Sequence, residues 1–262
     1  MKLYKKAVIF LILPALAAVS FYFFYMRPRH VTPILVYHSI ADDKESSLSV
    51  SPENFSRQME FLKKNGYSVI TLDELVKNIN AGETYLPRTV VITFDDGYED
   101  NFTEAFPVLA KHDMPAIIFL VTSYVDSKEE YLKWNQIRLM RLNKMDFGAH
   151  TRNNVYLPAV ESEEELWSEV AGSKEDIEKA TGKAADYFCY PTGGFNENVK
   201  LAVKKAGYKG ACTTNRGFDR LNKDVFELNR VKITDSDMTK PFHFRAKLSG
   251  YYNLFRSYKS GD

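Results

Sequence analysis

The sequence lacks any strong imbalance of charge, because 35 Lys and Arg residues stand against 34 Asp and Glu and leave a net charge of +1. Proteins that bind nucleic acid usually carry a clustered basic excess that displaces counterions from phosphate. We therefore exclude nucleic acid as a partner. Internal repeats and low-complexity linkers are also lacking, so residues 31–262 are predicted to form one domain.

Cysteine is scarce, and the two that are present, Cys189 and Cys212, lie far apart in the sequence. Their spacing fits neither a zinc knuckle nor a disulfide framework. A single Cys189–Cys212 disulfide stays open, because each cysteine falls within a predicted strand. The length and a composition of 45% hydrophobic and 26% charged residues suit one α/β domain, a barrel included, with a full core.

The first 30 residues differ from the rest of the chain. Three lysines within the first six residues precede an uncharged run from Ala7 to Tyr25, and two arginines follow it. As a helix this run would span roughly 28 Å, close to the hydrocarbon core of a bilayer. We predict that residues 1–30 are a cytoplasmic stub and membrane anchor. Small residues at Ala15 and Ala17 leave a cleaved signal peptide as the alternative.

The charges around this run also predict its orientation. The basic groups before the run outnumber those after it, which keeps the amino end in the cytoplasm. Residues 31–262 are then expected outside the cytoplasm, on a single-pass protein of the cell membrane, or secreted if the leader is cleaved. No cysteine lies directly after the run, which argues against a lipid anchor.

From residue 31 onward, short β-type runs alternate with amphipathic helical stretches, the pattern of a mostly parallel sheet or barrel with helices outside. Helices are expected after the capping signals at Ser51 and Thr71. Further helices are expected around Asn101–His112, Trp134–Asn143, Glu163–Lys179 and Glu197–Ala206. Eight strands, enough to close a barrel, are predicted at Ile34–His38, Tyr67–Ile70, Thr89–Phe94, Ala116–Val121, Met145–Ala149, Tyr187–Tyr190, Gly210–Thr214 and Leu228–Ile233.

Two adjacent carboxylates stand where the strand Thr89–Phe94 ends, in the sequence Asp95-Asp96-Gly97. Asp-Asp-Gly alone is typical of a tight turn. However, active sites of parallel α/β folds gather beyond the carboxyl ends of strands. At that position one carboxylate can bind a cation while the other takes up a proton, so the pair is interpreted as a base beside a metal ligand.

Three more strand ends carry groups that suit chemistry. His150 follows the strand Met145–Ala149 and offers an imidazole, a common metal ligand. His38 ends the first strand, where a residue at the rim of the sheet is the alternative interpretation. In Pro191–Gly194 a proline and two glycines can aim backbone N–H groups into the site as an oxyanion hole.

Together these segments resemble the polysaccharide deacetylase (NodB-homology) family of carbohydrate esterases, over nearly all of residues 31–235. The run Thr-Phe-Asp-Asp-Gly matches the family's first motif, which implies Asp95 as the general base and Asp96 as a metal ligand. The second motif, His-Ser/Thr-x-x-His, implies His150 as a ligand. Asn154 stands in the place of the second histidine, and an amide oxygen is a poorer ligand than imidazole for zinc-like metals.

The third motif, usually Arg-x-Pro-Tyr-Gly, reads Cys189–Gly193 here. The resemblance implies the Thr192 N–H as an oxyanion donor, whereas the cysteine cannot replace the arginine that steadies the base. Arg230 is our candidate for the missing arginine, with a surface charge as the alternative. A branch of the family that deacetylates poly-N-acetylglucosamine also lacks this arginine and has a similar Tyr-His first strand, and we infer His38 as the catalytic acid.

The resemblance implies a distorted (β/α) barrel, which follows the transmembrane helix predicted from the uncharged run, and a metal-dependent hydrolase that removes acetyl groups from N-acetylated polysaccharide. Zinc is the expected divalent ion, with cobalt, nickel or manganese as alternatives. Two other functions stay open: a catalytically degenerate, polysaccharide-binding scaffold, and an O-acetyl esterase. A polymer requires an open groove, whose predicted sugar-facing residues are Tyr98, Trp134, Tyr190 and Pro191.

Overall fold

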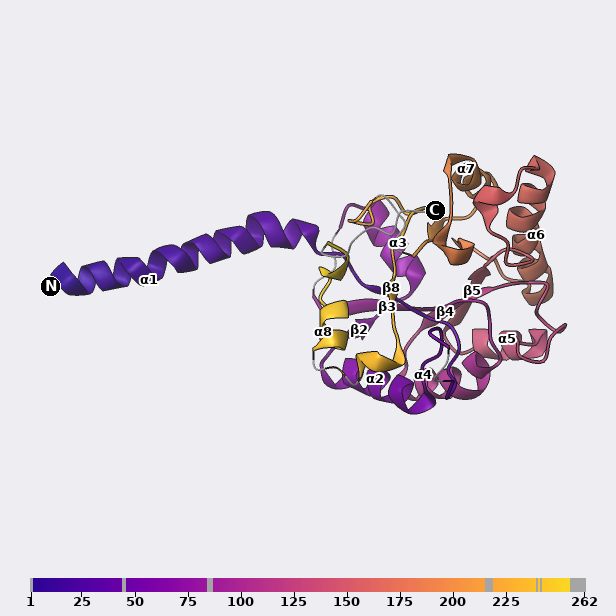
Figure 1. Cartoon of the computed structure of the whole chain (residues 1–262), viewed down its shortest axis with the longest axis horizontal. Helices are drawn as coiled ribbons and strands as arrows, with labels where there is room; N and C mark the ends of the chain where they lie inside the picture. The colour runs from indigo at the N-terminus through magenta and orange to yellow at the C-terminus, as the bar shows by residue number, and fades with distance from the viewer. Residues whose placement is uncertain are drawn as a thin grey trace.

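The structure is a computed structural model that describes residues 2–43, 46–83, 87–214, 219–238, 240 and 242–254. Its centre is a parallel sheet with helices packed around it (Figure 1). All eight predicted strands are confirmed, most of them shorter than predicted. They are β1 (Ile34–Tyr37), β2 (Ser68–Val69), β3 (Thr89–Phe94), β4 (Ala116–Leu120), β5 (Met145–Ala149), β6 (Tyr187–Cys189), β7 (Gly210–Cys212) and β8 (Val231–Lys232).

The strands follow the order β7-β6-β5-β4-β3-β1-β8, and β2 pairs with the first half of β3. Every ladder is parallel. The segment that leads into β8 joins the two ends of this order, because Leu228 forms a parallel bridge with Cys212 of β7 while β8 pairs with β1. The sheet is therefore curled into a distorted barrel, and the carboxyl ends of its strands meet at one rim.

The helices return the chain from that rim to the start of the next strand. As predicted, the Ser51 side chain caps α2 (Pro52–Lys64), and Thr71 and Glu74 form a capping box at α3 (Leu72–Asn80). A π-helical turn at Asn101–Ala105 precedes α4. The remaining helices are α4 (Phe106–His112), α5 (Trp134–Arg141), α6 (Glu163–Thr181), α7 (Glu197–Lys205) and α8 (His243–Lys247).

Nearly continuous apolar runs form the strands, because both faces of the sheet are covered. All residues of β1, β3 and β4 are buried. Phe55, Met59 and Leu62 of α2 are fully buried against this core, as their helical spacing predicted. This packing fixes the strand ends, and with them the side chains that follow.

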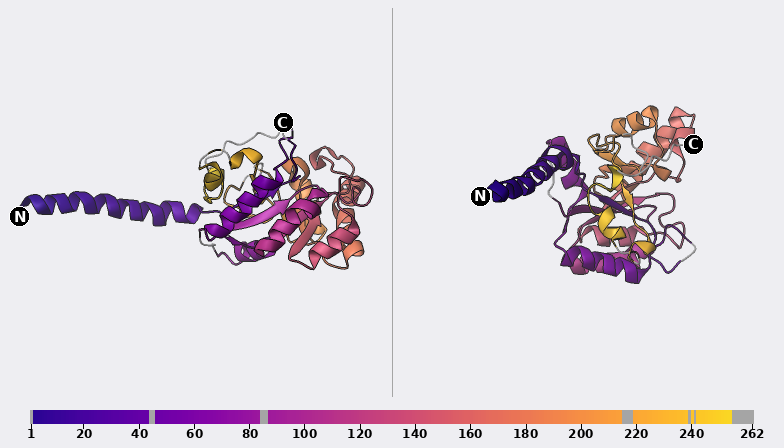
Figure 2. Two further views of the ribbon diagram at one scale, coloured as in Figure 1. Left: turned by 90° about the horizontal axis from the view of Figure 1, so that it is seen from below. Right: turned by 60° about the vertical axis from the view of Figure 1, so that its left-hand side comes forward.

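The amino-terminal helix α1 (Lys2–Phe21) extends away from the curled sheet (Figures 1 and 2). Within the described part of the chain, no helix is both long enough and apolar enough to cross a membrane. The anchor over residues 1–30 therefore stays a prediction.

Candidate active site

The two carboxylates predicted as the centre of the site lie at the end of β3. The backbone turns sharply there, since Asp96 and Gly97 have φ values of 70° and 79°. Both aspartates are buried, with 4% and 8% of their surfaces exposed. Because the turn separates two neighbouring side chains, Asp95 and Asp96 contact different partners.

Asp95 is paired with Arg230 in the interior of the curled sheet. The two guanidinium Nη atoms each donate to one carboxylate oxygen of Asp95, both at 2.7 Å. Arg230 is only 1% exposed and also donates to Thr93 Oγ1 at 3.1 Å and to the Thr213 carbonyl at 2.9 Å. This bidentate, fully hydrogen-bonded geometry is the one in which a buried ion pair holds its partners most firmly.

Burial by itself would raise the pKa of Asp95, but the charge and hydrogen bonds of Arg230 outweigh it and hold that pKa below its ordinary value. The structure thus places Arg230 where the sequence interpretation put the missing arginine. It comes from the segment before β8, whereas the family's motif would supply an arginine at the position of Cys189, in β6.

Cys189 lies between these groups, although sequence reasoning noted it only as a residue that cannot replace the motif's arginine. Its Sγ accepts from Arg230 Nη2 at 3.0 Å and is 3.6 Å from each carboxylate oxygen of Asp95. Burial raises the pKa of the Cys189 thiol well above its ordinary value. Cys212 is its register partner in β7, and both cysteines are free and buried, so the disulfide left open by the sequence is not formed.

Asp96 faces His150, which follows β5. His150 Nε2 is 3.6 Å from Asp96 Oδ1, and His150 Nδ1 is 2.8 Å from the Cys189 carbonyl oxygen. A carbonyl can only accept, so Nδ1 carries a proton, and Nε2 is the ring nitrogen that faces Asp96. A carboxylate oxygen and a neutral imidazole nitrogen at this separation fit two ligands of one zinc-like ion.

His38 approaches the other side of the base, with Nε2 3.9 Å from Asp95 Oδ2. Burial lowers the pKa of His38, against the raising effect of Asp95. Asn101 Nδ2 donates to the His38 carbonyl at 2.8 Å, which fixes this strand end to the turn that opens α4. Asn101 is fully buried, but its residue type alone indicated only a helix start.

A second set of possible ligands exists among the described residues, because one side-chain atom each of Asp95, His150 and Cys189 lie within 4.8 Å of one another. This set suits a cation poorly. Asp95 is already occupied by a guanidinium, and the Cys189 sulfur accepts from the same guanidinium at 3.0 Å, which leaves a cation beside both ligands. Asp96 with His150 is the better pair.

The remaining predicted residues of the reaction lie on loops at the same rim. Asn154 is exposed and its backbone N–H donates to Thr151 Oγ1, while no described contact joins its side chain to Asp96 or His150. Thr192 is exposed in a left-handed conformation, in a loop that Thr213 holds by donating to the Gly193 carbonyl at 2.7 Å. Their proposed roles as ligand and oxyanion donor stay predictions.

The prediction that Tyr190 and Pro191 face the sugar is wrong. The Tyr190 side chain is fully buried, donates to the Phe226 carbonyl and stacks on Phe195. Pro191 is buried beside it. Both residues therefore belong to the core, where the Tyr190 ring also contacts the ring of Phe188.

Tyr98 and Trp134 are half-buried. Their contact with the sugar stays a prediction. Tyr98 stacks on Tyr131 with ring centroids 5.0 Å apart. Trp134 begins α5 and packs partly against the core.

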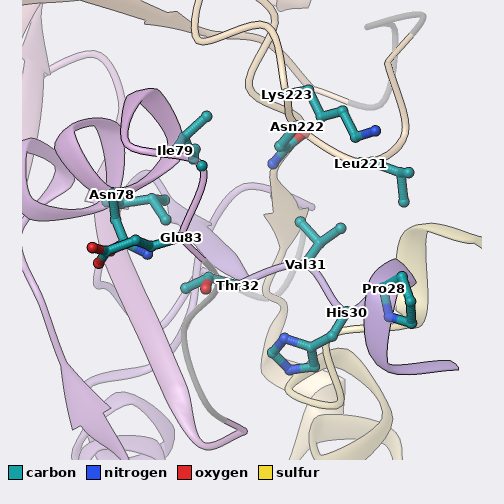
Figure 3. A pocket seen from close by; sticks show the side chains of 12 residues that line it. Pro28, His30, Val31, Thr32, Asn78, Ile79, Glu83, Leu221, Asn222 and Lys223 are labelled. Atoms are coloured by element: carbon teal, nitrogen blue, oxygen red, sulfur yellow. The ribbon is translucent and has the colours of Figure 1, made fainter. Parts of the chain in front are cut away.

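A cavity of about 310 Å³ lies near the start of β1, at the opposite end of the sheet from the aspartates (Figure 3). None of the predicted catalytic or ligand residues lines it. Its walls include His30, Thr32, Asn78, Glu83, Asn222 and Lys223.

Comparisons with known proteins agree with this geometry. Residues 82–211 match the family model for polysaccharide deacetylase. YxkH of Bacillus subtilis, which is named as a polysaccharide deacetylase, is 32% identical over 202 residues, covering 77% of this chain and 71% of YxkH. The poly-beta-1,6-N-acetyl-D-glucosamine N-deacetylase of Staphylococcus epidermidis is 26% identical over 226 residues, covering 80% and 78%.

Solved structures are similar over most of the chain. The Streptococcus pyogenes deacetylase PplD, in complex with acetate, superposes with a TM-score of 0.72 at 27% identity, covering 78% of this chain and 92% of PplD. A Bacillus cereus polysaccharide deacetylase gives a TM-score of 0.70 at 30% identity, covering 83% and 68%.

Proposed function

The chain belongs to the polysaccharide deacetylase family, and from this premise we propose that it hydrolyses the acetamido groups of an N-acetylated polysaccharide to acetate and free amino sugar. One observation carries the proposal: the buried Asp95–Arg230 pair lies beside the Asp96–His150 pair at a single rim of the sheet. The amide substrate in the name of the Staphylococcus epidermidis relative supports N-acetyl over O-acetyl groups.

Asp96 and His150 would hold the divalent ion that this family implies, with zinc preferred for the imidazole nitrogen and cobalt, nickel or manganese as alternatives. Such an ion supplies Lewis acidity, which polarises the acetyl carbonyl and makes water a better nucleophile. The hydrogen bond from His150 to the Cys189 carbonyl keeps the imidazole in the tautomer that this ligation needs.

Asp95 is suited to take a proton from the attacking water. The lowered pKa of Asp95 keeps its carboxylate ionised at neutral pH, so the carboxylate is free to accept a proton. Arg230 fixes both carboxylate oxygens, which holds the base in one orientation throughout the reaction. The exposed loop at Thr192 would offer its backbone N–H to the developing oxyanion.

His38 is suited to deliver a proton to the leaving amine. Its lowered pKa leaves it neutral at rest, so it first has to gain the proton it gives away. Asp95 lies 3.9 Å from His38 Nε2 and is the nearest described source. In this sequence the proton passes from water to Asp95, then to His38, and finally to the amine nitrogen as the C–N bond breaks.

We also propose that residues 1–30 anchor the protein in the cell membrane, with the site outside the cytoplasm. The support is the uncharged run from Ala7 to Tyr25 between basic flanks. A polymer substrate outside the cell would be consistent with that location.

The test uses the full chain in detergent, stripped of metal with a chelator and supplied again with zinc, cobalt, nickel or manganese. Acetate release from N-acetylglucosamine oligomers should require the ion and should be lost in Asp95→Asn. A protein that binds the oligomers but releases no acetate with any of the four ions would instead be the degenerate, polysaccharide-binding member. Acetate released only from O-acetylated glycans would identify an esterase.

A further inference from the structure

A groove of about 210 Å³ runs between the start of α6 and the face of α7, two helices that lie side by side (Figure 1). Its floor is apolar and buried, from Leu157, Leu166, Val199 and Ala202. Trp167 and Leu201 also line it, and these two side chains are 46% and 49% exposed. The groove therefore presents a large aromatic surface to solvent.

This exposure is unusual for the residue type. Tryptophan contributes more apolar area than any other side chain and is normally well covered. Trp134, the only other tryptophan of the chain, is half-buried and packs partly against the core. Trp167 lies one turn into α6, where Ser162 already caps the helix, so the helix does not need an aromatic side chain at this position.

The groove adjoins a loop of the catalytic rim, because Leu157 and Asn196, which line it, lie within two residues of Tyr156 and Gly194. The ring of Tyr156, 43% exposed, packs so closely on Gly194 that a side chain there would collide with it. Gly194 ends the loop that carries Thr192, and Asn196, two residues later, both caps α7 and lines the groove. A chain that leaves the reacting centre over this loop would reach Trp167.

The chemistry of the lining suits a neutral sugar. A sugar ring has an apolar face of C–H groups that packs on an aromatic ring, and hydroxyl and acetamido groups around its edge. The groove supplies the aromatic face and surrounds it with hydrogen-bonding side chains: Glu161, Ser162, Glu163, Asn196, Asn198 and Lys205. Two carboxylates stand against one ammonium group, so the lining disfavours a polyanion and is compatible with a neutral sugar.

We propose that this groove is a sugar-binding subsite, which holds one residue of the N-acetylated polymer at a distance from the residue being deacetylated. The inference rests on the proposed function for the identity of the polymer. Its volume, below the roughly 300–1,000 Å³ of pockets that enclose drug-sized ligands, suits a single sugar ring and not an oligomer.

The test measures binding separately from catalysis. The full chain in detergent, stripped of metal, is titrated calorimetrically with β-1,6-linked N-acetylglucosamine oligomers of one to five residues. Trp167→Ala should weaken binding of the pentamer roughly tenfold, because the aromatic surface is lost, and leave the shortest oligomers unchanged. Trp167→Phe should retain most of the affinity. The matched control is Leu142→Ala, which removes another exposed apolar side chain, 82% exposed, at the end of α5.

Acetate release from the same oligomers then separates the two proposals. With the metal restored, Trp167→Ala should raise KM for the pentamer about tenfold while kcat stays the same. Length-dependent binding through Trp167 without acetate release would leave the subsite standing and refute the deacetylase. A wild-type chain that binds no pentamer, or a Trp167→Ala variant that binds it as the wild type does, would overturn the subsite. Concentration-dependent self-association that Trp167→Ala abolishes, with pentamer binding unaltered, would assign the groove to a protein contact and overturn it also.

Discussion

The two aspartates that end β3 are neighbours in sequence but differ in how the protein holds them. Asp95 has both oxygens bound by a buried arginine and a thiol beside them. Asp96 lies at a sharp turn, 3.6 Å from His150, and the exposed Asn154 makes no described side-chain contact with either. The base is thus held by the fold as a whole, whereas the ligand pair depends on the chemistry of two side chains at the rim.

Of the substitutions considered, the loss of Arg230 should have the largest effect, because Arg230 holds both oxygens of Asp95. Arg230→Ala leaves Asp95 as a buried charge without its cation, which is expected to lower the free energy of unfolding by about 3–5 kcal/mol and abolish acetate release. Urea unfolding followed by circular dichroism measures the loss. The control is Lys144→Ala, because the Lys144–Asp113 pair is well exposed and its removal should change stability by less than about 1 kcal/mol. Equal losses in the two variants would contradict the contrast.

Asp95→Asn should leave the proposed metal ligands in place while removing the base, and because Arg230 then loses its buried counterion, the free energy of unfolding should fall as well. We expect acetate release to fall roughly 10²–10⁴-fold, the usual contribution of a general base. Zinc affinity, measured by competition with a chromophoric chelator, should be unaltered, because Asp96 and His150 are the proposed ligands. A parallel loss of zinc binding would instead favour the set of Asp95, His150 and Cys189.

Zinc affinity in two variants, Asp96→Ala and Cys189→Ser, tests which side chains bind the metal. Asp96→Ala should weaken zinc binding more than roughly 100-fold, beyond the 10- to 100-fold cost of losing a partner behind a ligand. Cys189→Ser should change it little, since the sulfur of Cys189 contacts the Arg230 guanidinium at 3.0 Å, where a second cation is disfavoured. The visible spectrum of the cobalt form offers an independent check, because a sulfur ligand would add a charge-transfer band that Cys189→Ser removes.

Asn154→His should have the smallest effect, in the favourable direction. It restores the second imidazole of the family's motif, and we expect zinc affinity to rise about tenfold, or ~1.4 kcal/mol. Asn154→Ala is the control for merely losing the amide. A histidine variant that binds zinc no better than the alanine variant would place residue 154 outside the ligand sphere.

Much of the fold could be predicted because local signals determine it. The strands β3 and β5 have the predicted bounds, and the caps at Ser51 and Thr71 form as their sequences indicated. The aspartates and His150 could be found because strand ends of a parallel sheet share one rim. β8 is shorter than predicted because the chain before it turns from β7 toward β1.

The parts that sequence reasoning missed depend on packing between distant segments. Tyr190 follows a strand as the catalytic groups do, but its ring stacks on Phe195 and its hydroxyl donates to the Phe226 carbonyl, 36 residues later. Cys189 enters the site because Arg230, 41 residues later, donates to its sulfur. No periodicity or motif encodes such encounters. Trp167 was also missed, because an exposed tryptophan on a helix looks like a core residue until its neighbours are placed.

The ion pair between Asp95 and Arg230 joins positions 135 residues apart. Because Arg230 lies in the segment that links β7 to β1, its cation reaches the base only when the last part of the sheet has closed. A partly synthesised chain therefore carries an aspartate without its counterion, so the base is present but is not yet held in position. Completion of the fold and positioning of the base are therefore one event, because Asp95 gains its counterion only when the last part of the sheet closes.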